Sequence, residues 1–324
     1  MFKFKRKKEK PLLSPVQVLR RKVIRLRIAF LSTLVVLGIG LFVLIFSNFN
    51  YLLFKTLIAR NYIHTYTLDE MFLYHLGFVP SNHARYFDNL VIAIVTQLIR
   101  VKGGDIYTYL YTPAQRIAME ERIRTRAAGA EFYEIVPGTV VLRLPNTAPL
   151  VQNFVFDNRD EIGVFDNLIL DLRGNNGGEL AVVQNIASLF LQTGDTIAFD
   201  ETRWNLFSRE RRARRRHSGF FDFDHIIILQ DASTASSAEV LIAALAAHLD
   251  NETTIGEQTF GKAVGQVTLP LRQGFAVRAT VLNIQNPQGE SIHNIGIAPH
   301  IEYKGDDMLS FALDKLQGGN INER

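Results

Sequence analysis

The stretch HIIILQDASTASSAEVLIAALAAHL, residues 225–249, predicts a buried strand, a short turn and a helix in direct succession. An uninterrupted apolar run such as HIIIL is typical of a strand that is covered on both faces. The turn is rich in Ser and Ala, and we expect the helix to begin at about Ser236, because serine is common at helix N-termini. A strand that leads through a turn into a helix is the unit from which α/β sheets are built.

The same alternation recurs on both sides of this stretch. The further predicted strands are GTVVLRLP at 138–145, FDNLILDL at 165–172, TTIGE at 253–257, GQVTLPL at 265–271 and FAVRATVLNIQNP at 275–287. A helix is predicted in LAVVQNIASLFLQTG at 180–194, because its apolar residues recur at helical spacing. Strands that alternate with helices in this way predict an α/β fold with a sheet as its core.

The N-terminal part of the chain differs from the rest. Residues 1–27 carry eleven Lys and Arg and one Glu, whereas residues 28–47, IAFLSTLVVLGIGLFVLIFS, carry no charge. About twenty apolar residues span a bilayer as a helix, and a basic flank stays on the cytoplasmic side. A buried core helix and a cleaved signal peptide are the alternatives, but soluble helices have a polar face and no A-x-A-like site follows the run. We therefore expect an uncleaved signal anchor.

Residues 50–102 are expected to be helical. Apolar residues recur at helical spacing in DEMFLYHLGF at 69–78 and in YFDNLVIAIVTQLIRV at 86–101, and Gly103-Gly104 ends the second run. A further helix is predicted in YTPAQRIAMEERIRTRAA at 111–128, because proline is favoured in a first helical turn.

Composition excludes several kinds of site. The chain has no Cys, so disulfides, thiolate metal sites and a cysteine nucleophile are excluded. Its eight His are scattered without an H-E-x-x-H motif, so we expect no metal and no cofactor. Beyond residue 27 the chain has 25 basic and 31 acidic residues, which argues against nucleic-acid binding. The basic run RERRARRR at 209–216 is expected to be a solvated loop, with attraction to an anionic membrane surface or an acidic substrate as the alternatives.

The segment GEQTFGKAVGQ, residues 256–266, supports two interpretations. Gly256, Gly261 and Lys262 match the start of a phosphate-binding loop, G-x-x-x-x-G-K. That loop requires Ser or Thr after the lysine and a helix next, but Ala263 and a predicted strand follow. The other interpretation is a catalytic base, since burial among apolar neighbours lowers the pKa of a lysine and leaves it neutral.

Two other turns carry groups that fit with such a lysine. Ser236 lies at a helix N-terminus, where free backbone N–H groups stabilise an oxyanion, although a plain helix cap is the simpler interpretation. The turn DLRGNNGG at 171–178 follows a buried strand, and its glycines allow a ligand to approach the backbone. Together the three turns supply a hydroxyl, N–H groups and a lysine. A serine paired with a lysine is a known variant of nucleophile–base catalysis.

Over roughly residues 103–303, the chain resembles the carboxyl-terminal processing, or tail-specific, serine proteases. The segments that carry the resemblance occur in the family's order. They are GGDIYTYLYTPAQ, GTVVLRLPNTA, NLILDLRGNNGGEL, DASTASSAEVLIAALAAH, TIGEQTFGKAVGQ and NPQGESIHNIGIAPHIE. The resemblance implies the mixed-sheet protease core of that family, preceded here by a helical region and one transmembrane helix.

The resemblance also implies a role for each matched residue. The nucleophile falls on Ser236, the general base on Lys262 and the residue that orients the lysine on Gln266. The oxyanion donors fall on the backbone N–H of Ser237 and on that of Gly177 or Gly178. The implied reaction is attack on a peptide carbonyl, followed by hydrolysis of an acyl-enzyme.

The chain departs from the family pattern at several positions. Ser237 stands where the family usually has alanine, so Ser237 is an alternative nucleophile, and His300 stands where it usually has aspartate. The family usually carries a PDZ domain before its core, but only about twenty residues separate Thr112 from Gly138. Because a PDZ domain binds peptide C-termini, its absence puts selectivity for C-termini in doubt.

These observations predict a membrane-anchored serine endopeptidase outside the cytoplasm, acting on protein or peptide substrates. A catalytically weak homologue that binds peptide or serves as a membrane scaffold is the alternative, and a regulatory partner or an oligomer fits either. The expected divisions are a basic cytoplasmic tail, a signal anchor, a helical region, the protease core and a C-terminal tail. They comprise residues 1–27, 28–48, 49–136, 137–306 and 307–324.

Overall fold

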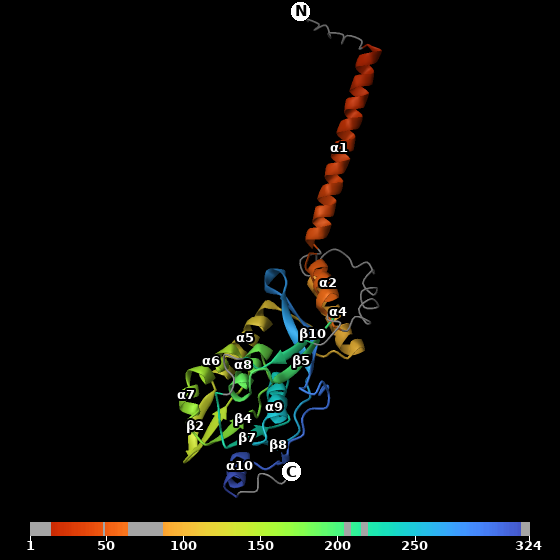
Figure 1. Ribbon diagram of the computed structural model, residues 1–324. Helices are drawn as coiled ribbons and strands as arrows, with labels where there is room; N and C mark the ends of the chain where they lie inside the picture. Colours follow the sequence, from red (N-terminus) through yellow and green to blue (C-terminus); the bar gives the residue numbers. More distant parts are fainter. Residues whose placement is uncertain (1–13, 48, 64–86, 204–208, 215–219, 319–324) are drawn as a thin grey trace, which may run out of the picture.

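A six-stranded sheet lies at the centre of the body of the protein (Figure 1). The computed structural model describes residues 14–47, 49–63, 87–203, 209–214 and 220–318. The strands in spatial order are β11 (Ile301–Glu302), β8 (Glu252–Gly256), β7 (His225–Gln230), β4 (Asn167–Asp171), β3 (Thr139–Arg143) and β2 (Glu131–Val136). All neighbours are parallel except β2 and β3, so the sheet is mixed.

Helices cover both faces of this sheet, because successive side chains of a strand point to opposite sides. On one face, Leu168, Leu170 and Ile228 belong to a core with α8 (Leu180–Phe190) and α9 (Ser237–His248). On the other face, Ile169 and Ile227 pack against Met308 and Ala312 of α10 (Met308–Gln317). The shorter helices α6 (Pro149–Asp157) and α7 (Arg159–Ile162) complete the first face. Burial on both faces explains why β4 and β7 read as continuous apolar runs.

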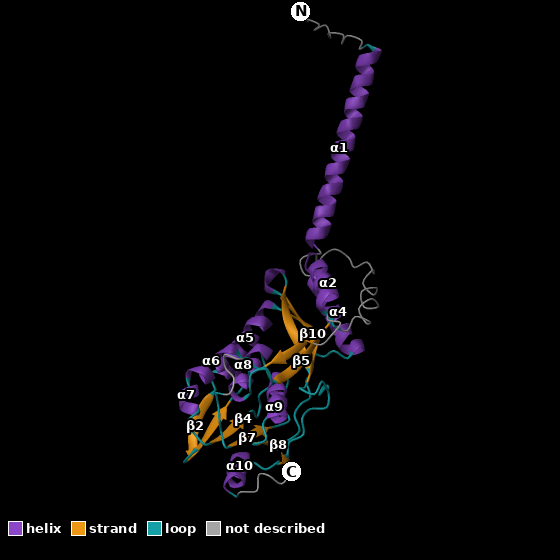
Figure 2. Ribbon diagram, viewed as in Figure 1, coloured by secondary structure: helices purple, strands orange, loops and turns teal. Residues whose placement is uncertain are grey.

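A second sheet lies beside the first and carries an antiparallel hairpin (Figure 2). Its strands are β1 (Tyr109–Tyr111), β5 (Thr196–Thr202), β6 (Arg209–Arg212), β9 (Val264–Pro270) and β10 (Ala276–Gln285). The order is β1-β10-β5-β6, and β9 pairs with β10. A short 3-10 turn at Arg272–Gly274 joins β9 to β10, and Gln273 and Gly274 there have positive φ.

Two helices near the N-terminus pack on this hairpin. Helices α2 (Phe49–Asn61) and α4 (Phe87–Gly103) contribute Phe54, Ile58, Ile92, Val95 and Ile99 to a core that is separate from the first. Leu271, Val277 and Ala279 of the hairpin region fill the other side of that core. Since each of these side chains is buried, the helical region and the hairpin form one packed unit.

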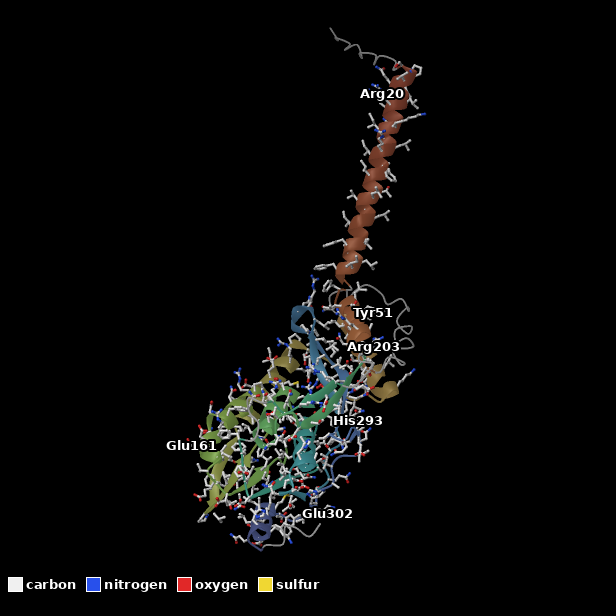
Figure 3. All side chains as sticks on the ribbon, viewed as in Figure 1. Arg20, Tyr51, Glu161, Arg203, His293 and Glu302 are labelled. Carbon is white, nitrogen blue, oxygen red and sulfur yellow. The ribbon has the colours of Figure 1, made fainter. Side chains whose placement is uncertain are left out.

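Helix α1 (Pro15–Ser47) extends away from the body as an isolated rod (Figure 1). A 32-residue portion has a mean hydropathy of 2.8 in its most apolar window, and none of that window is buried. Arg20 lies near the end of α1 that is farther from the body (Figure 3). At the nearer end, the Arg272 guanidinium lies over the rings of Phe46 and Phe49, at 5.0 and 4.0 Å from their centroids. The hairpin thus contacts the base of the long helix.

The structure confirms the α/β fold, the mixed sheet and the apolar N-terminal helix. The predicted helix at 111–128 is α5 (Pro113–Ala127), with Thr112 as its N-cap and Pro113 in its first turn. The predicted helix in DEMFLYHLGF lies outside the described residues. The predicted solvated loop at 209–216 is wrong for its described part, because Arg209–Arg212 forms β6 and Arg211 pairs with the buried Asp200 at 2.5 Å.

Two elements pack on the central sheet although both lie outside the expected protease core of residues 137–306. Strand β2 falls within the predicted helical region of 49–136, yet it pairs with β3 in the central sheet. Helix α10 falls within the predicted tail of 307–324, yet its Met308 and Ala312 are buried against that sheet. Apolar periodicity alone does not show these packing partners, which lie far away in the sequence. Helix α5 and β2 fill the interval in which the resembled family usually carries a PDZ domain.

Candidate active site

Ser236 immediately precedes α9 in an unusual backbone conformation. Its φ of 61° and ψ of −124° lie in a region that non-glycine residues rarely adopt, and the residue is 8% exposed. Strain of this kind persists only where the surroundings impose it, and it is concentrated at functional sites. A Cβ on Gly177 would lie 2.8 Å from Ser236 Cβ, so the glycine turn approaches Ser236 more closely than any other residue type allows.

The buried carboxylate of Glu239 joins the Ser236 turn to the Lys262 turn. Its Oε2 accepts from the Ser236 N–H at 2.7 Å and from the Lys262 N–H at 2.9 Å. Its Oε1 accepts from Thr259 Oγ1 at 2.5 Å and from the Gly261 N–H at 2.7 Å. Glu239 is fully buried, so these four donors stabilise a carboxylate that burial alone would penalise. The arrangement fixes two turns that are 26 residues apart in the sequence.

The side chain of Lys262 lies in a partly buried position beside an aromatic ring. Its Nζ is 4.9 Å from the centroid of the Tyr107 ring. The pKa of Lys262 is lowered from its ordinary value of 10.5 to about 8, chiefly by burial and secondly by the charge of Arg278. The carboxylates of Glu239 and Asp105 act in the opposite direction but do not outweigh burial. A lysine with a pKa near 8 is able to act as a base close to neutral pH.

A buried polar network holds Tyr107 in place. Asp105 Oδ1 accepts from the Tyr107 N–H at 3.0 Å and from Thr280 Oγ1 at 3.1 Å. Asp105 Oδ2 accepts from Thr108 Oγ1 at 2.6 Å, and Thr108 Oγ1 in turn accepts from the Thr280 N–H at 3.0 Å. Because Thr280 belongs to β10, the network fastens the segment before β1 to the hairpin whose first strand follows Lys262.

Gln266 lies on β9 near Lys262, but its amide bonds to other groups. Its Oε1 accepts from an Arg278 guanidinium nitrogen at 3.3 Å, and its Nε2 donates to the Val264 carbonyl at 3.0 Å. The structure thus places Gln266 against Arg278, the residue whose charge helps to lower the pKa of Lys262. The expected contact between Gln266 and Lys262 is not among the hydrogen bonds of the described residues.

The hydroxyl of Ser237 is fully buried and already bonded. Its Oγ accepts from the Gly178 N–H at 2.7 Å and lies 2.6 Å from Thr147 Oγ1. The Gly177 N–H donates to Asn175 Oδ1 at 2.9 Å. Both expected glycine donors therefore have internal acceptors in this structure. The Ser237 N–H lies at the first residue of α9, where a helix offers no internal acceptor.

The three turns do meet in space, as expected of turns that each lie beside a strand of the predicted sheet. Within the described residues, Ser236 Oγ and Lys262 Nζ make no direct hydrogen bond. Among the residues that the structure describes, no group of three or more His, Asp or Glu is placed to hold a metal ion.

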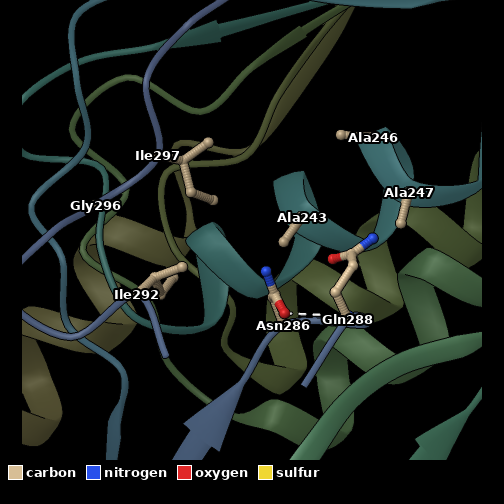
Figure 4. A pocket seen from close by; sticks show the side chains of 8 residues that line it. All are labelled: Ala243, Ala246, Ala247, Asn286, Gln288, Ile292, Gly296 and Ile297. Atoms are coloured by element: carbon tan, nitrogen blue, oxygen red, sulfur yellow. Dashed lines mark hydrogen bonds between the residues drawn. The ribbon is translucent and has the colours of Figure 1, made fainter. Parts of the chain in front are cut away.

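An apolar pocket of about 270 Å³ lies between the second half of α9 and the segment that follows β10 (Figure 4). Ala243 and Ala247 line its helical side and Ile292 and Ile297 line the other. None of its lining residues is titratable, so it offers no chemistry of its own.

Sequence reasoning missed the roles of Glu239, Tyr107 and Arg278. Glu239 carried a usable signal, because Ser-x-x-Glu before an apolar run is the pattern of a capping box. Tyr107 and Arg278 carried none, since Tyr107 comes near Lys262 through the β1–β10 pairing and Arg278 through the β9–β10 pairing.

Comparison with known proteins adds an independent finding. The family model described as Peptidase family S41 matches residues 141–303, which is 163 of the 324 residues. A carboxy-terminal-processing protease of Bartonella bacilliformis is 34% identical over 158 residues, covering 46% of this chain and 35% of the relative. A carboxyl-terminal-processing protease of Synechocystis is 34% identical over 171 residues, covering 48% of this chain and 38% of the relative. The chain thus spans well under half the length of these relatives.

Solved structures show the same fold. A lipoprotein from Streptococcus agalactiae superposes with a TM-score of 0.65 at 16% identity, covering 84% of this chain and 96% of that one. A photosystem II D1 C-terminal processing protease superposes with a TM-score of 0.59 at 16% identity, covering 80% of this chain and 93% of that one.

Proposed function

Because this chain belongs to peptidase family S41, we propose that it is a serine peptidase with Ser236 as its nucleophile and Lys262 as its general base. The observation that carries the proposal is the shared carboxylate of Glu239, which binds the backbone of both residues. The pKa of Lys262, lowered to about 8, supports the role of base. About a tenth of such a lysine is neutral at pH 7, against about 0.03% at its ordinary pKa.

The proposed reaction begins with transfer of the Ser236 Oγ proton to the neutral Lys262 Nζ. As Oγ bonds to the peptide carbonyl carbon, the carbonyl π electrons move to oxygen and form an oxyanion. The Ser237 N–H is the first donor to that oxyanion, and a glycine N–H of Gly177 or Gly178 joins it by exchanging its internal acceptor. Collapse breaks the C–N bond, and the leaving amine takes the proton from Lys262. Water then attacks the acyl-enzyme by the same route, which restores Ser236.

Ser236 is preferred to Ser237 as nucleophile. The Ser237 hydroxyl is fully buried between Thr147 and Gly178, whereas Ser236 retains some exposure and occupies the strained turn. We assign Gln266 a positioning role through Arg278, because its amide oxygen bonds to that guanidinium.

We further propose that α1 anchors the protein in a membrane. The helix is long and apolar, and the bilayer solvates the side chains that the body leaves exposed. The five basic residues of its first half are expected to stay on the cytoplasmic side, which places the peptidase body outside the cytoplasm. We place the end of the anchor near Phe46, where Arg272 contacts it. The core would then begin with β2 and end with α10, rather than at residues 137 and 306.

Protein or peptide substrates follow from the proposed reaction. Relatives named for carboxyl-terminal processing make cleavage near C-termini the first expectation. Because α5 and β2 occupy the interval before the core, recognition of the substrate has to come from another surface of this chain or from a partner.

A peptide-binding or scaffold protein with little activity is the second candidate function. The observation that favours it is the engagement of both glycine N–H groups by internal acceptors, which leaves the expected oxyanion site incomplete. A catalytic role requires those bonds to exchange when substrate binds, whereas a binding role does not.

One experiment separates the two candidates. The full chain, purified in detergent micelles, is incubated with an unfolded model protein beside the variants Ser236→Ala and Lys262→Ala, and fragments are identified by mass spectrometry. The proposal predicts fragments from the wild type and from neither variant, and the fragment ends show whether cleavage starts at the C-terminus. Equal fragments from all three would refute the assignment of these residues. Binding of the unfolded protein without any cleavage would support the scaffold.

A further inference from the structure

Strand β9, which begins two residues after Lys262, has one edge that no strand of the described residues covers. Its partner is β10, and among the described residues no other strand pairs with β9. The Ile284 N–H donates to the Ala263 carbonyl and the Leu271 N–H donates to the Phe275 carbonyl, so Ala263 and Leu271 both direct main-chain groups toward β10. The main-chain groups of an antiparallel strand alternate in direction. The register shift of this pair lies on β10, between Thr280 and Leu282, so the alternation along β9 is not interrupted.

The alternation defines which groups of β9 point outward. Val264, Gln266, Thr268 and Pro270 have their main-chain groups on the free edge. Two observations agree with this assignment. The Val264 carbonyl accepts from the Gln266 side chain rather than from β10. Pro270 has no N–H to donate. It lies at a strand position whose N–H would point away from β10, so the missing N–H costs no hydrogen bond between β9 and β10.

Apart from Pro270 at its end, this edge lacks the charges and the shortness that protect β6, β2 and β11. Natural proteins shield open edges with charges or by keeping the strand short, because an open edge pairs with other chains. Strand β6 reads RERR, β2 exposes Glu131 and Glu134, and β11 has only two residues. Strand β9 reads VGQVTLP over seven residues without a charge, and Val267 is 40% exposed.

We propose that the free edge of β9 binds the substrate, an extended peptide that adds to the sheet as a further strand. The proposal rests on the proposed peptidase function and deepens it. The continuity of β9 with Lys262 selects the substrate over other occupants, because a peptide paired with Thr268 and Gln266 runs directly toward the Lys262 turn. Main-chain pairing holds a peptide largely irrespective of its sequence, and side chains on the strand add selectivity.

The geometry sets the length of peptide that the edge requires. Thr268 lies six residues beyond Lys262, which is about 20 Å along a strand. A peptide of about ten residues therefore reaches from the site of cleavage to Thr268, whereas a peptide of four residues does not. The edge supplies the recognition surface that the interval before the core, occupied by α5 and β2, does not supply through a PDZ domain.

Thr268→Pro tests the edge, with Thr268→Ala as its matched control. Proline removes the outward N–H and leaves the bonds between β9 and β10 in place, since Thr268 lies opposite Arg278 with its main-chain groups outward. The assay measures kcat/KM of the full chain in micelles for a ten-residue and a four-residue peptide with the same scissile bond. We expect Thr268→Pro to lower kcat/KM for the ten-residue peptide, relative to that for the four-residue peptide, about fivefold to tenfold, as loss of one or two hydrogen bonds implies. Thr268→Ala should preserve this ratio.

A binding measurement keeps this test separate from the proposed activity. In the Ser236→Ala background, fluorescence anisotropy reports the Kd of a labelled ten-residue peptide with and without Thr268→Pro. Weaker binding by fivefold or more supports the edge, even if the wild type proves inactive, which would overturn the proposed function alone. Cleavage by the wild type with the same ratio and Kd in Thr268→Pro would overturn the edge alone. A wild-type dimer that Thr268→Pro converts to monomer, at an unchanged Kd, would assign the edge to a second copy and also overturn the proposal.

Discussion

On the proposed mechanism, replacing Arg278 by Met is expected to shift the pH dependence of cleavage to higher pH. The charge of Arg278 is one of the causes that lower the pKa of Lys262, and its side chain also holds Gln266. Removing that charge makes protonation of Lys262 more favourable, so the pKa of Lys262 rises. As the proposed base, Lys262 acts only when it is neutral, so the cleavage rate at a given pH below the pKa falls as the pKa rises.

The size of the expected loss of activity follows from the difference between the lowered pKa of Lys262 and its ordinary value. A lysine with a pKa of about 8 is neutral to about 9% at pH 7, and each unit of increase lowers that fraction about tenfold. The ordinary value of 10.5 sets a ceiling of about 300-fold on the loss at pH 7. Because burial is the larger cause and remains in the variant, the observed loss should be well below this ceiling. Above pH 10.5 the two proteins should cleave at similar rates.

The assay is kcat/KM of the full chain against a ten-residue peptide between pH 6 and 11. The wild type should show a rate that rises with pH to an inflection at about 8, and Arg278→Met should show the inflection at higher pH. Arg278→Lys is the control, since it keeps the charge but not the guanidinium contact with Gln266. An inflection that stays at about 8 in Arg278→Met, or that moves equally in Arg278→Lys, would refute the electrostatic argument.

Three further predictions concern the same site. Lys262→Met should raise the free energy of unfolding at pH 7 by up to about 3 kcal/mol, because the folded-state pKa lies below the unfolded value and the charged form costs stability below pH 8. Thermal melts should show this gain shrinking between pH 8 and 10.5. Glu239→Gln should destabilise the fold by about 2–4 kcal/mol and abolish cleavage, because an amide cannot accept from all four donors; a melt within 1 °C of wild type would contradict this. Ser237→Ala should raise kcat, by up to about tenfold, because it removes the internal acceptor that competes for the Gly178 N–H, and Thr147→Val should add little in the double variant; a lower kcat in Ser237→Ala would contradict the exchange of that bond during catalysis.

Much of the fold could be predicted because short apolar runs and turns indicate individual strands and helices. The runs NLILD and HIIILQ are apolar throughout because both faces of β4 and β7 are covered, and sequence alone shows this. Strands β5 and β6 were missed, since FDET and RERR carry charges that are satisfied only across the pair, as in the Arg211–Asp200 ion pair. Helix α10 was missed as part of the core, because its partner strands lie far away in the sequence.

The candidate site shows the same division. The glycine turn, Ser236 and Lys262 could be identified from short motifs, because each depends on a local turn beside a strand. The position of Gln266 could not, since its partner Arg278 lies across the β9–β10 pair. The engagement of Gly178 by Ser237 also escaped prediction, because Thr147, which completes that contact, is 90 residues from Ser237. Long-range contacts of buried polar groups therefore account for most of what the sequence left undetermined.

Locating the acyl group on the protein tests the central assignment most directly. The full chain is mixed with a peptide ester at pH 8, quenched with acid during the first turnover, digested and mapped by tandem mass spectrometry, since an activated ester accumulates the acyl-enzyme. The proposed mechanism predicts an acyl group on Ser236 in the wild type and none in Ser236→Ala. An acyl group on Ser237, or one that persists in Ser236→Ala, would contradict it.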